Sequence, residues 1–320
     1  MYSEHYGLDA RPFQLSPDPR FFFDSRSHRK ALAYLTFGLS ESEGFIVITG
    51  DVGAGKTTLV GHLLESIDRD QYVFASIVTT QLGADDALRM VASAFGLAID
   101  SVDKATLLRR IEDFFRACRE QGRHVLLVVD EAQNLSLAAL EELRMLSNFH
   151  ADGRPLVQCF LLGQPQFRAM MSRREMEQLR QRVIASCHLE PMAEDETRAY
   201  IEHRLRHVGW KEDPSFTPAA FHQIHIHSGG VPRRINTLCS RLMLYGFLED
   251  IHDFGEAQVK EVASELADEG TQLSAVGTEQ AMVKPLSGAA AWPLTETYRG
   301  ALSALDRRVA ALVGHARGTR

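Results

Sequence analysis

Residues 50–57, Gly-Asp-Val-Gly-Ala-Gly-Lys-Thr, are the feature that most constrains the fold of this chain. They fit the pattern G-x-x-x-x-G-K-[S/T] and lie between an apolar run, residues 45–49, and a segment of helical character, residues 58–64. A buried strand, a glycine-rich turn and a helix N-terminus, in this order, are typical of a loop that binds phosphate. Glycines let the backbone N–H groups point inward at phosphate oxygens, and the helix dipole adds partial positive charge there. The sequence therefore predicts a phosphate-binding loop.

This loop predicts ATP and Mg²⁺ as ligands. Lys56 is expected to reach the β- and γ-phosphates, and the Thr57 hydroxyl is expected to hold Mg²⁺. The residues expected to bind the nucleotide are Gly50, Asp51, Val52, Gly53, Ala54, Gly55, Lys56, Thr57 and Thr58.

Two carboxylates end a second apolar run, in which residues 124–129 precede Asp130 and Glu131. The carboxyl ends of parallel strands are where such sheets bind ligands, and an uncompensated buried charge costs several kcal/mol. We therefore expect Asp130 to hold Mg²⁺ through water and Glu131 to orient or deprotonate an attacking water. An N-cap for the next helix is the alternative for this pair.

Gln164 follows the expected strand of residues 156–162, where a polar side chain would lie beside the γ-phosphate. The alternative is that it satisfies backbone groups of the turn before Pro165. Arg180 and Arg182 precede the last expected core strand, residues 185–189. Either could be presented to a neighbouring subunit's γ-phosphate as an arginine finger, or both could form solvated surface pairs.

Composition and net charge limit the kinds of protein that this chain can be. The chain has 320 residues, 45% hydrophobic and 24% charged, which suits two soluble domains. A net charge of −7 makes nucleic acid an unlikely partner. Four widely spaced cysteines, Cys118, Cys159, Cys187 and Cys239, predict reduced, buried thiols. No signal peptide and no apolar run of roughly 20 residues are present, so we expect a cytoplasmic protein.

Alternating strand and helix patterns predict an α/β fold, a parallel P-loop NTPase sheet sandwiched by helices, followed by a small all-helical lid domain. The expected divisions are an aromatic and proline-rich arm (1–28), the ATPase core (29–190), the lid (191–268), a flexible linker (269–293) and a C-terminal amphipathic helix (294–320). The arm is expected to be extended, and it either only covers the core or also lines a pocket for the nucleotide base.

Arg233 opens a helix of the lid directly after Gly230, Val231 and Pro232. A cation opposes the helix dipole at that end, so we expect Arg233 to reach the bound phosphates. His222, His225 and His227 lie nearby, but their spacing completes no metal site and predicts surface histidines.

Together the phosphate loop, Asp130-Glu131, Gln164, the two arginines and Gly-Val-Pro-Arg at residues 230–233 resemble the AAA+ ATPases over about residues 30–265. More narrowly, Tyr-Gly-Leu at 6–8, Pro-Asp-Pro-Arg-Phe-Phe at 17–22 and Gly-Gln-Pro at 163–165 are similar to the ExeA, or general secretion pathway A, type. Within that type the likeness is greatest to the secretion ATPases of exosortase (PEP-CTERM) and exopolysaccharide loci.

The resemblance implies that Lys56, Thr57, Asp130 and Glu131 act in ATP hydrolysis, with Gln164 as sensor one, Arg233 as sensor two and Arg180 or Arg182 as the finger. It also implies a ring or dimer with the nucleotide at the subunit boundary, and a membrane-associated secretion or polysaccharide-assembly partner. The alternatives are a DNA-associated ATPase resembling transposition target-selection subunits and a nucleotide-gated scaffold with little turnover.

Overall fold

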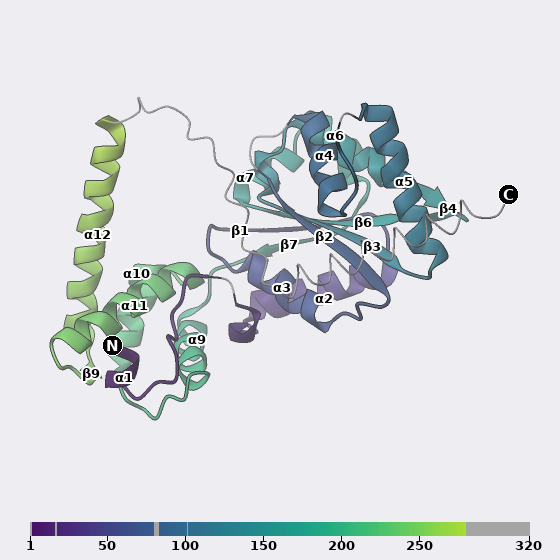
Figure 1. Ribbon diagram of the computed structural model, residues 1–320. Coiled ribbons are helices and arrows are strands. Elements are labelled where there is room, and N and C mark those ends of the chain that lie inside the picture. The colour runs from purple at the N-terminus through teal and green to yellow at the C-terminus, as the bar shows by residue number, and fades with distance from the viewer. Residues whose placement is uncertain (1, 17, 80–82, 101, 280–320) are drawn as a thin grey trace.

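The computed structural model describes residues 2–16, 18–79, 83–100 and 102–279. Five parallel strands form the central sheet in the order β2-β3-β6-β1-β7 (Figure 1). They are β1 (Phe45–Gly50), β2 (Tyr72–Val78), β3 (His124–Asp130), β6 (Val157–Gly163) and β7 (Val183–Leu189). The predicted parallel sheet is confirmed. The last strand begins two residues earlier than predicted, because Val183 pairs with Phe45 of β1.

Helices cover both faces of the sheet. One face packs against α2 (Arg26–Glu41) and α3 (Lys56–Ser66). The other packs against α4 (Ala84–Ala94), α5 (Lys104–Glu120), α6 (Leu137–Leu146) and α7 (Pro165–Met171). The central strands β1 and β6 are buried along their whole length, as parallel strands between two helical layers must be. Ser25 and Ser136 cap α2 and α6 by accepting from backbone N–H groups.

Short elements connect these layers. They are η1 (Pro19–Phe21), η2 (Ala132–Asn134), β4 (His150–Ala151), β5 (Arg154–Pro155), η3 (Arg174–Met176) and α8 (Glu177–Arg180). All four cysteines are buried and free, which confirms the expected reduced thiols.

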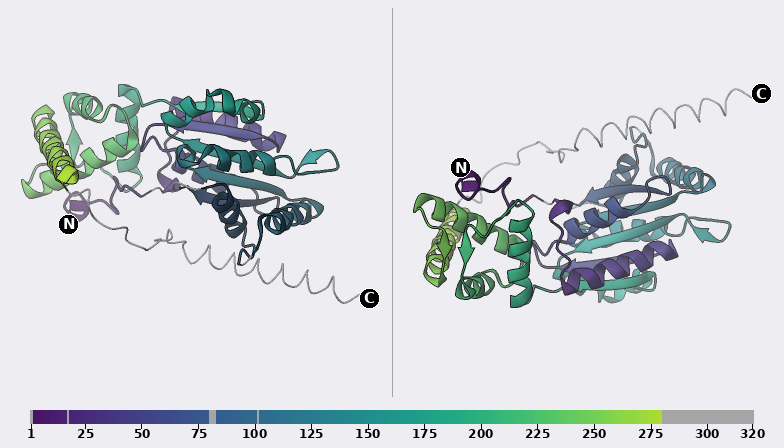
Figure 2. Two further views of the ribbon diagram at one scale, coloured as in Figure 1. Left: turned by 90° about the horizontal axis from the view of Figure 1, so that it is seen from above. Right: turned by 90° about the horizontal axis from the view of Figure 1, so that it is seen from below.

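The second part of the chain is built from α9 (Glu194–Arg206), α10 (Pro218–Ser228), α11 (Pro232–Leu248) and α12 (Glu256–Glu279). The two views of Figure 2 show it set against one end of the sheet. The expectation of helices alone needs one correction, because β8 (Ser215–Phe216) and β9 (Asp253–Phe254) form a short parallel pair. That pair joins the loops before α10 and α12, so it ties the helices without adding a layer.

The predicted linker at 269–293 also needs correction, because α12 continues to Glu279. Small and polar residues suggested a flexible segment, but no proline occurs before Pro285 to end the helix. The remainder of the linker and the C-terminal helix predicted at 294–320 lie outside the described residues.

The N-terminal arm packs into the core of the helical part. Its buried rings Tyr2, Tyr6, Phe13 and Phe21 belong to the same apolar cluster as α9, α10 and α11. The arm is less extended than predicted, since α1 (Tyr2–His5) and η1 each form a helical turn. The Tyr6 hydroxyl donates to the Ile251 carbonyl at 2.9 Å, which fixes the start of the chain to the lid.

Candidate functional site

The phosphate loop joins β1 to α3 and has the backbone that its glycines permit. Gly53 and Gly55 have φ values of +82° and +91°, in the region that side chains disfavour. Space is also short, because a Cβ on Gly53 would lie 2.2 Å from the Arg233 Cβ, and a Cβ on Gly55 would lie 2.9 Å from His28 Nε2. Glycine is therefore required at both positions by conformation and by contact.

His28, which the sequence analysis missed, supports the loop from α2. Its Nε2 lies 3.0 Å from the Ala54 carbonyl, and its Nδ1 lies 2.7 Å from Ser25 Oγ. A carbonyl only accepts, so Nε2 carries the proton and Nδ1 accepts from the hydroxyl. Burial lowers the pKa of His28, which keeps the ring neutral. Only its position three residues after the helix cap Ser25 hinted at this role.

Lys56 is 6% exposed and folds back over the loop. Its Nζ donates to the carbonyls of Gly50 at 2.9 Å and Asp51 at 3.0 Å. Burial lowers the pKa of Lys56, while the nearby carboxylates of Glu131 and Asp130 oppose that shift. A buried cation whose hydrogen bonds go to two carbonyls suits an anionic ligand in the loop.

Thr57 and Asp130 meet at the end of the sheet, as predicted. The Thr57 hydroxyl donates to Asp130 Oδ2 at 2.6 Å, and Asp130 Oδ1 accepts from the Glu131 N–H at 2.8 Å. Asp130 is 6% exposed. A hydroxyl and a carboxylate are oxygen ligands of the kind that Mg²⁺ takes, so this pair fits the ion.

Glu131 is held by two glutamine side chains. Its Oε2 accepts from Gln133 Nε2 at 2.5 Å and from Gln164 Nε2 at 3.0 Å. The Gln133 Oε1 in turn accepts from the Gln164 N–H at 2.9 Å, so the three residues are linked pairwise by hydrogen bonds. The structure thus brings Gln164 to Glu131, and it adds Gln133, which the sequence analysis did not single out.

Arg233 reaches the loop from the lid. Its backbone N–H donates to the Gly53 carbonyl at 3.1 Å, and its side-chain carbons pack over Gly53. The Arg233 side chain is exposed and lines a cavity that Lys56 and Thr57 also line.

Arg180 and Arg182 do not line this cavity. One Arg180 nitrogen donates to the carbonyls of Met171 and Arg173, both at 2.6 Å. Arg182 donates to the Ser147 carbonyl at 3.2 Å and to the Asn148 side chain. Both guanidinium groups therefore cap the ends of nearby helical segments within the chain.

The loop, the arm and the lid enclose a cavity of about 180 Å³. Gln14, Leu15, Ser16, Asp18 and the three phenylalanines at 21–23 line it from the arm. The arm thus does more than cover apolar core, because it also lines this cavity; that the cavity takes the nucleotide base stays a prediction.

A buried polar network under the cavity joins the arm to the lid and was also missed. Arg204 donates to the Pro12 carbonyl at 2.6 Å and to the Tyr200 hydroxyl at 2.9 Å. That hydroxyl donates to Asn236 Oδ1 at 2.9 Å. The Arg204 guanidinium also lies 4.6 Å from the centre of the Phe21 ring, a cation–π contact.

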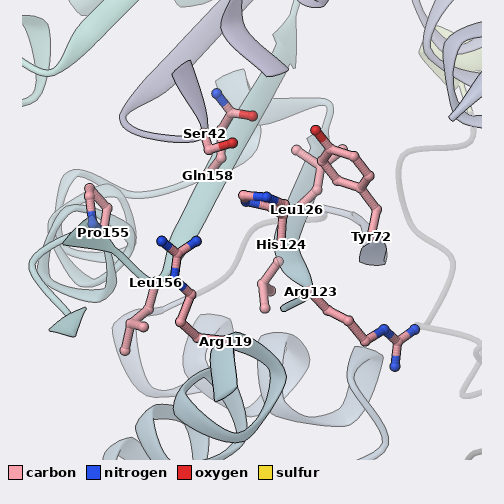
Figure 3. A pocket seen from close by; sticks show the side chains of 10 residues that line it. Ser42, Tyr72, Arg119, Arg123, His124, Leu126, Pro155, Leu156 and Gln158 are labelled. Atoms are coloured by element: carbon pink, nitrogen blue, oxygen red, sulfur yellow. The ribbon is translucent and has the colours of Figure 1, made fainter. Parts of the chain in front are cut away.

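A second hollow lies at the opposite end of the sheet (Figure 3). Tyr72, His124 and Gln158 line it near the starts of β2, β3 and β6. Its volume is about 10 Å³, room for about one water molecule. It is too small for a nucleotide.

Comparison with known proteins agrees with this geometry. Residues 39–171 match the AAA domain family. The sequence is 36% identical to General secretion pathway protein A of Aeromonas hydrophila over 296 residues, 91% of this chain, and it spans 53% of that protein's length. The chain thus spans about half the length of the curated relative it matches. Within the described residues, no helix is both long and apolar enough to cross a bilayer.

Two solved structures share the fold. Cdc6p from Pyrobaculum aerophilum has a TM-score of 0.63 at 16% identity, over 78% of this chain and 70% of its own. Drosophila ORC bound to DNA has a TM-score of 0.61 at 14% identity, over 80% of this chain and 64% of its own. At these identities the likeness concerns the fold alone.

Proposed function

We propose that this chain, which matches the AAA domain family over residues 39–171 and is 36% identical to General secretion pathway protein A, is an ATP hydrolase of the general secretion pathway A type. We propose further that it drives or switches an envelope secretion or exopolysaccharide-assembly system through protein partners. The proposal of ATP hydrolysis rests on one observation. Thr57, Asp130 and Glu131 lie together at one end of the sheet, beside Lys56.

Each residue has a distinct part in this proposal. Lys56 and the loop N–H groups hold the phosphates, and Thr57 and Asp130 hold Mg²⁺. The ion, when bound, supplies positive charge beside the phosphate oxygens. Glu131 orients the attacking water and accepts its proton, and its contacts with Gln133 and Gln164 set its position.

The lid and a second subunit complete the proposal. Arg233 senses the nucleotide from the lid, and the arm lines the pocket for the base. A finger role for Arg180 or Arg182 requires that assembly of a dimer or ring releases the helix-capping bonds each one makes here. The protein would act at the cytoplasmic side of the inner membrane, through a membrane-associated partner.

The test is nucleotide binding and steady-state hydrolysis by Lys56→Ala, with Lys211→Ala as control because Lys211 is an exposed loop residue. We expect turnover to be lost in the first variant and kept in the second. Turnover retained by Lys56→Ala would exclude hydrolysis at this loop. Nucleotide binding with no measurable hydrolysis in the wild type, with or without membrane extract, would favour a nucleotide-gated scaffold.

The secretion role needs a separate test. In a pull-down from membrane extract, the Glu131→Gln variant with ATP bound should retain membrane proteins that the Lys56→Ala variant does not retain. Salt-dependent binding of duplex DNA at physiological ionic strength would instead favour the DNA-associated alternative. The net charge of −7 opposes that alternative.

A further inference from the structure

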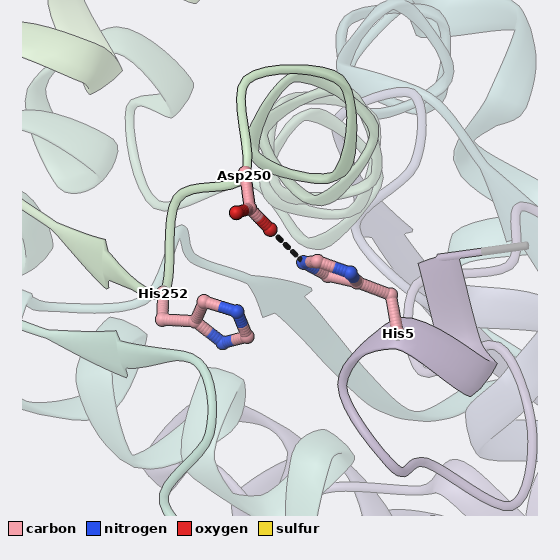
Figure 4. A group of neighbouring side chains, drawn as sticks. All are labelled: His5, Asp250 and His252. Atoms are coloured by element: carbon pink, nitrogen blue, oxygen red, sulfur yellow. Dashed lines mark ion pairs between the residues drawn. The ribbon is translucent and has the colours of Figure 1, made fainter.

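A group of three metal-ligating side chains lies far from the nucleotide cavity, where the start of the chain meets the lid. His5 comes from α1, and Asp250 and His252 come from the turn between α11 and β9 (Figure 4). One ligand atom from each lies within 4.8 Å of the other two. His5 Nε2 and Asp250 Oδ1 are 3.9 Å apart, too far for a hydrogen bond.

A buried ring nitrogen of His5 lacks a hydrogen-bond partner among the described residues. Its ring packs between Tyr6, Phe247 and His252, and its side chain is 18% exposed. Nε2 is fully buried and has no hydrogen-bond partner among the described residues. Buried polar atoms are ordinarily satisfied, so this one points to a missing partner.

His252 is oriented as metal-bound histidines are. Its Nδ1 lies 2.6 Å from Asp213 Oδ1, so Nδ1–H donates to that carboxylate and the lone pair remains on Nε2. A histidine that binds a metal typically donates its other ring N–H to a carboxylate, which fixes its tautomer and orientation. Asp213 would serve as this outer carboxylate.

We propose that His5, Asp250 and His252 form a Zn²⁺ site that fastens the N-terminal arm to the lid. Two imidazoles and one carboxylate are ligands that Zn²⁺ takes, whereas Mg²⁺ and Ca²⁺ favour oxygen alone. Water would fill the fourth position. With metal–ligand bonds of about 2.0–2.2 Å and tetrahedral angles, the ligand atoms must approach to about 3.3–3.6 Å of one another. Asp250, whose side chain is 88% exposed, is free to close that gap.

The proposal is independent of ATP hydrolysis, because none of these three residues lines the nucleotide cavity. Its effect would be on the arm, which the ion would join to the lid through ligands 245 and 247 positions apart in the sequence. Zn²⁺ would therefore raise the melting temperature and protect the arm from proteolysis.

The test is calorimetric titration of Zn²⁺ into the full chain, stripped of metal and nucleotide, with excess Mg²⁺ present to occupy oxygen sites. The variants are His5→Phe, which keeps an aromatic ring among Tyr6 and Phe247, and Asp250→Asn, an exposed change that leaves packing intact. His222→Phe is the control, because His222 pairs with a single carboxylate, Glu194.

We expect the wild type and the control to bind one more Zn²⁺ than His5→Phe, and to gain melting temperature that this variant does not. Asp250→Asn should bind at least 10-fold more weakly, and Asp213→Asn about 10–100-fold more weakly. Equal stoichiometry and affinity in wild type and His5→Phe would overturn the proposal. A wild type whose melting temperature does not rise with Zn²⁺ would also overturn it.

Discussion

Gln164 Nε2 lies 3.0 Å from Glu131 Oε2, and so the side chain that follows β6 holds the carboxylate that follows β3. Gln133 donates to the same oxygen from the other side. Two amide donors on one oxygen fix the carboxylate in place. The position of the proposed general base thus depends on residues from two neighbouring strand ends.

Gln133→Leu should slow ATP hydrolysis by about 100-fold, because a small displacement of a catalytic group has an effect of that size. Nucleotide affinity should stay near that of the wild type, since Gln133 does not line the cavity. Steady-state rates and nucleotide Kd values check this, with exposed Gln166→Leu as control. Equal loss of affinity and rate would contradict a positioning role.

Glu131→Gln should bind ATP and hydrolyse it about 10²–10⁴-fold more slowly, the usual contribution of a general base. The substituted amide keeps the side chain's size but cannot take a proton from water. Single-turnover hydrolysis and ATP binding are the measurements, and exposed Glu120→Gln should behave as wild type. Loss of ATP binding in Glu131→Gln would show that Glu131 holds the nucleotide instead.

Gly53→Ala should weaken nucleotide binding, because its Cβ would meet Arg233 at 2.2 Å. Gly122→Ala is the matched control: its φ of +74° gives the same backbone strain, but its Cβ has open space. Each should lose about 1 kcal/mol or more of stability from positive φ. Only Gly53→Ala should also lose nucleotide affinity, measured by fluorescence titration.

Arg233→Ala should lower nucleotide affinity or turnover, while Arg234→Ala should not. Both side chains are exposed at the start of α11, but only Arg233 lines the cavity. The loss of a charge-assisted contact with phosphate is expected to cost about 1.5–3 kcal/mol, or roughly 10–100-fold. Equal Kd and kcat values for the two variants would show that Arg233 does not act at the site.

His28 should make the folded protein less stable as the pH falls. Burial holds the pKa of His28 below 6.5, so below about pH 6.5 the unfolded chain takes up a proton that the folded chain does not. The free energy of unfolding therefore decreases as pH falls, by at most about 1.4 kcal/mol per pH unit for this group. His28→Gln should flatten that slope in denaturant titrations between pH 7.5 and 5.5.

His124 and His203 have pKa shifts of the same direction, so part of the slope will remain in His28→Gln. An unchanged slope in His28→Gln would mean that the buried ring titrates as it does in the unfolded chain.

Local pattern was enough to predict the loop, the parallel sheet and the meeting of Thr57 with Asp130. Each of these follows from a contiguous motif and from the rule that parallel strands end at one edge. Gln133, His28 and Arg204 were missed because each also bonds to a residue distant in the sequence, namely Gln164, Ala54 and Pro12. Arg204 bonds to Pro12, 192 positions away, and no periodicity marks such a pair.

The arm illustrates the same limit. Its prolines and rings predicted an extended covering segment, but not that most of its buried rings would pack with α9 and α11. Continuation of α12 to Glu279 was missed because small polar residues are common both in linkers and in the exposed ends of helices.

Because the arm packs into the lid's core, two segments of chain pass between the lid and the sheet, one before α2 and one after β7. They run together, since Ser27 Oγ donates to the Glu190 carbonyl at 3.1 Å and the Arg26 N–H donates to Glu196 at 2.7 Å. The arm's buried rings, the lid and α12 share one apolar cluster, and the Arg233 N–H holds the lid to the Gly53 carbonyl of the phosphate loop. A ligand that displaced Arg233 from this contact would therefore move those rings and α12, about 36 Å long, together with the lid.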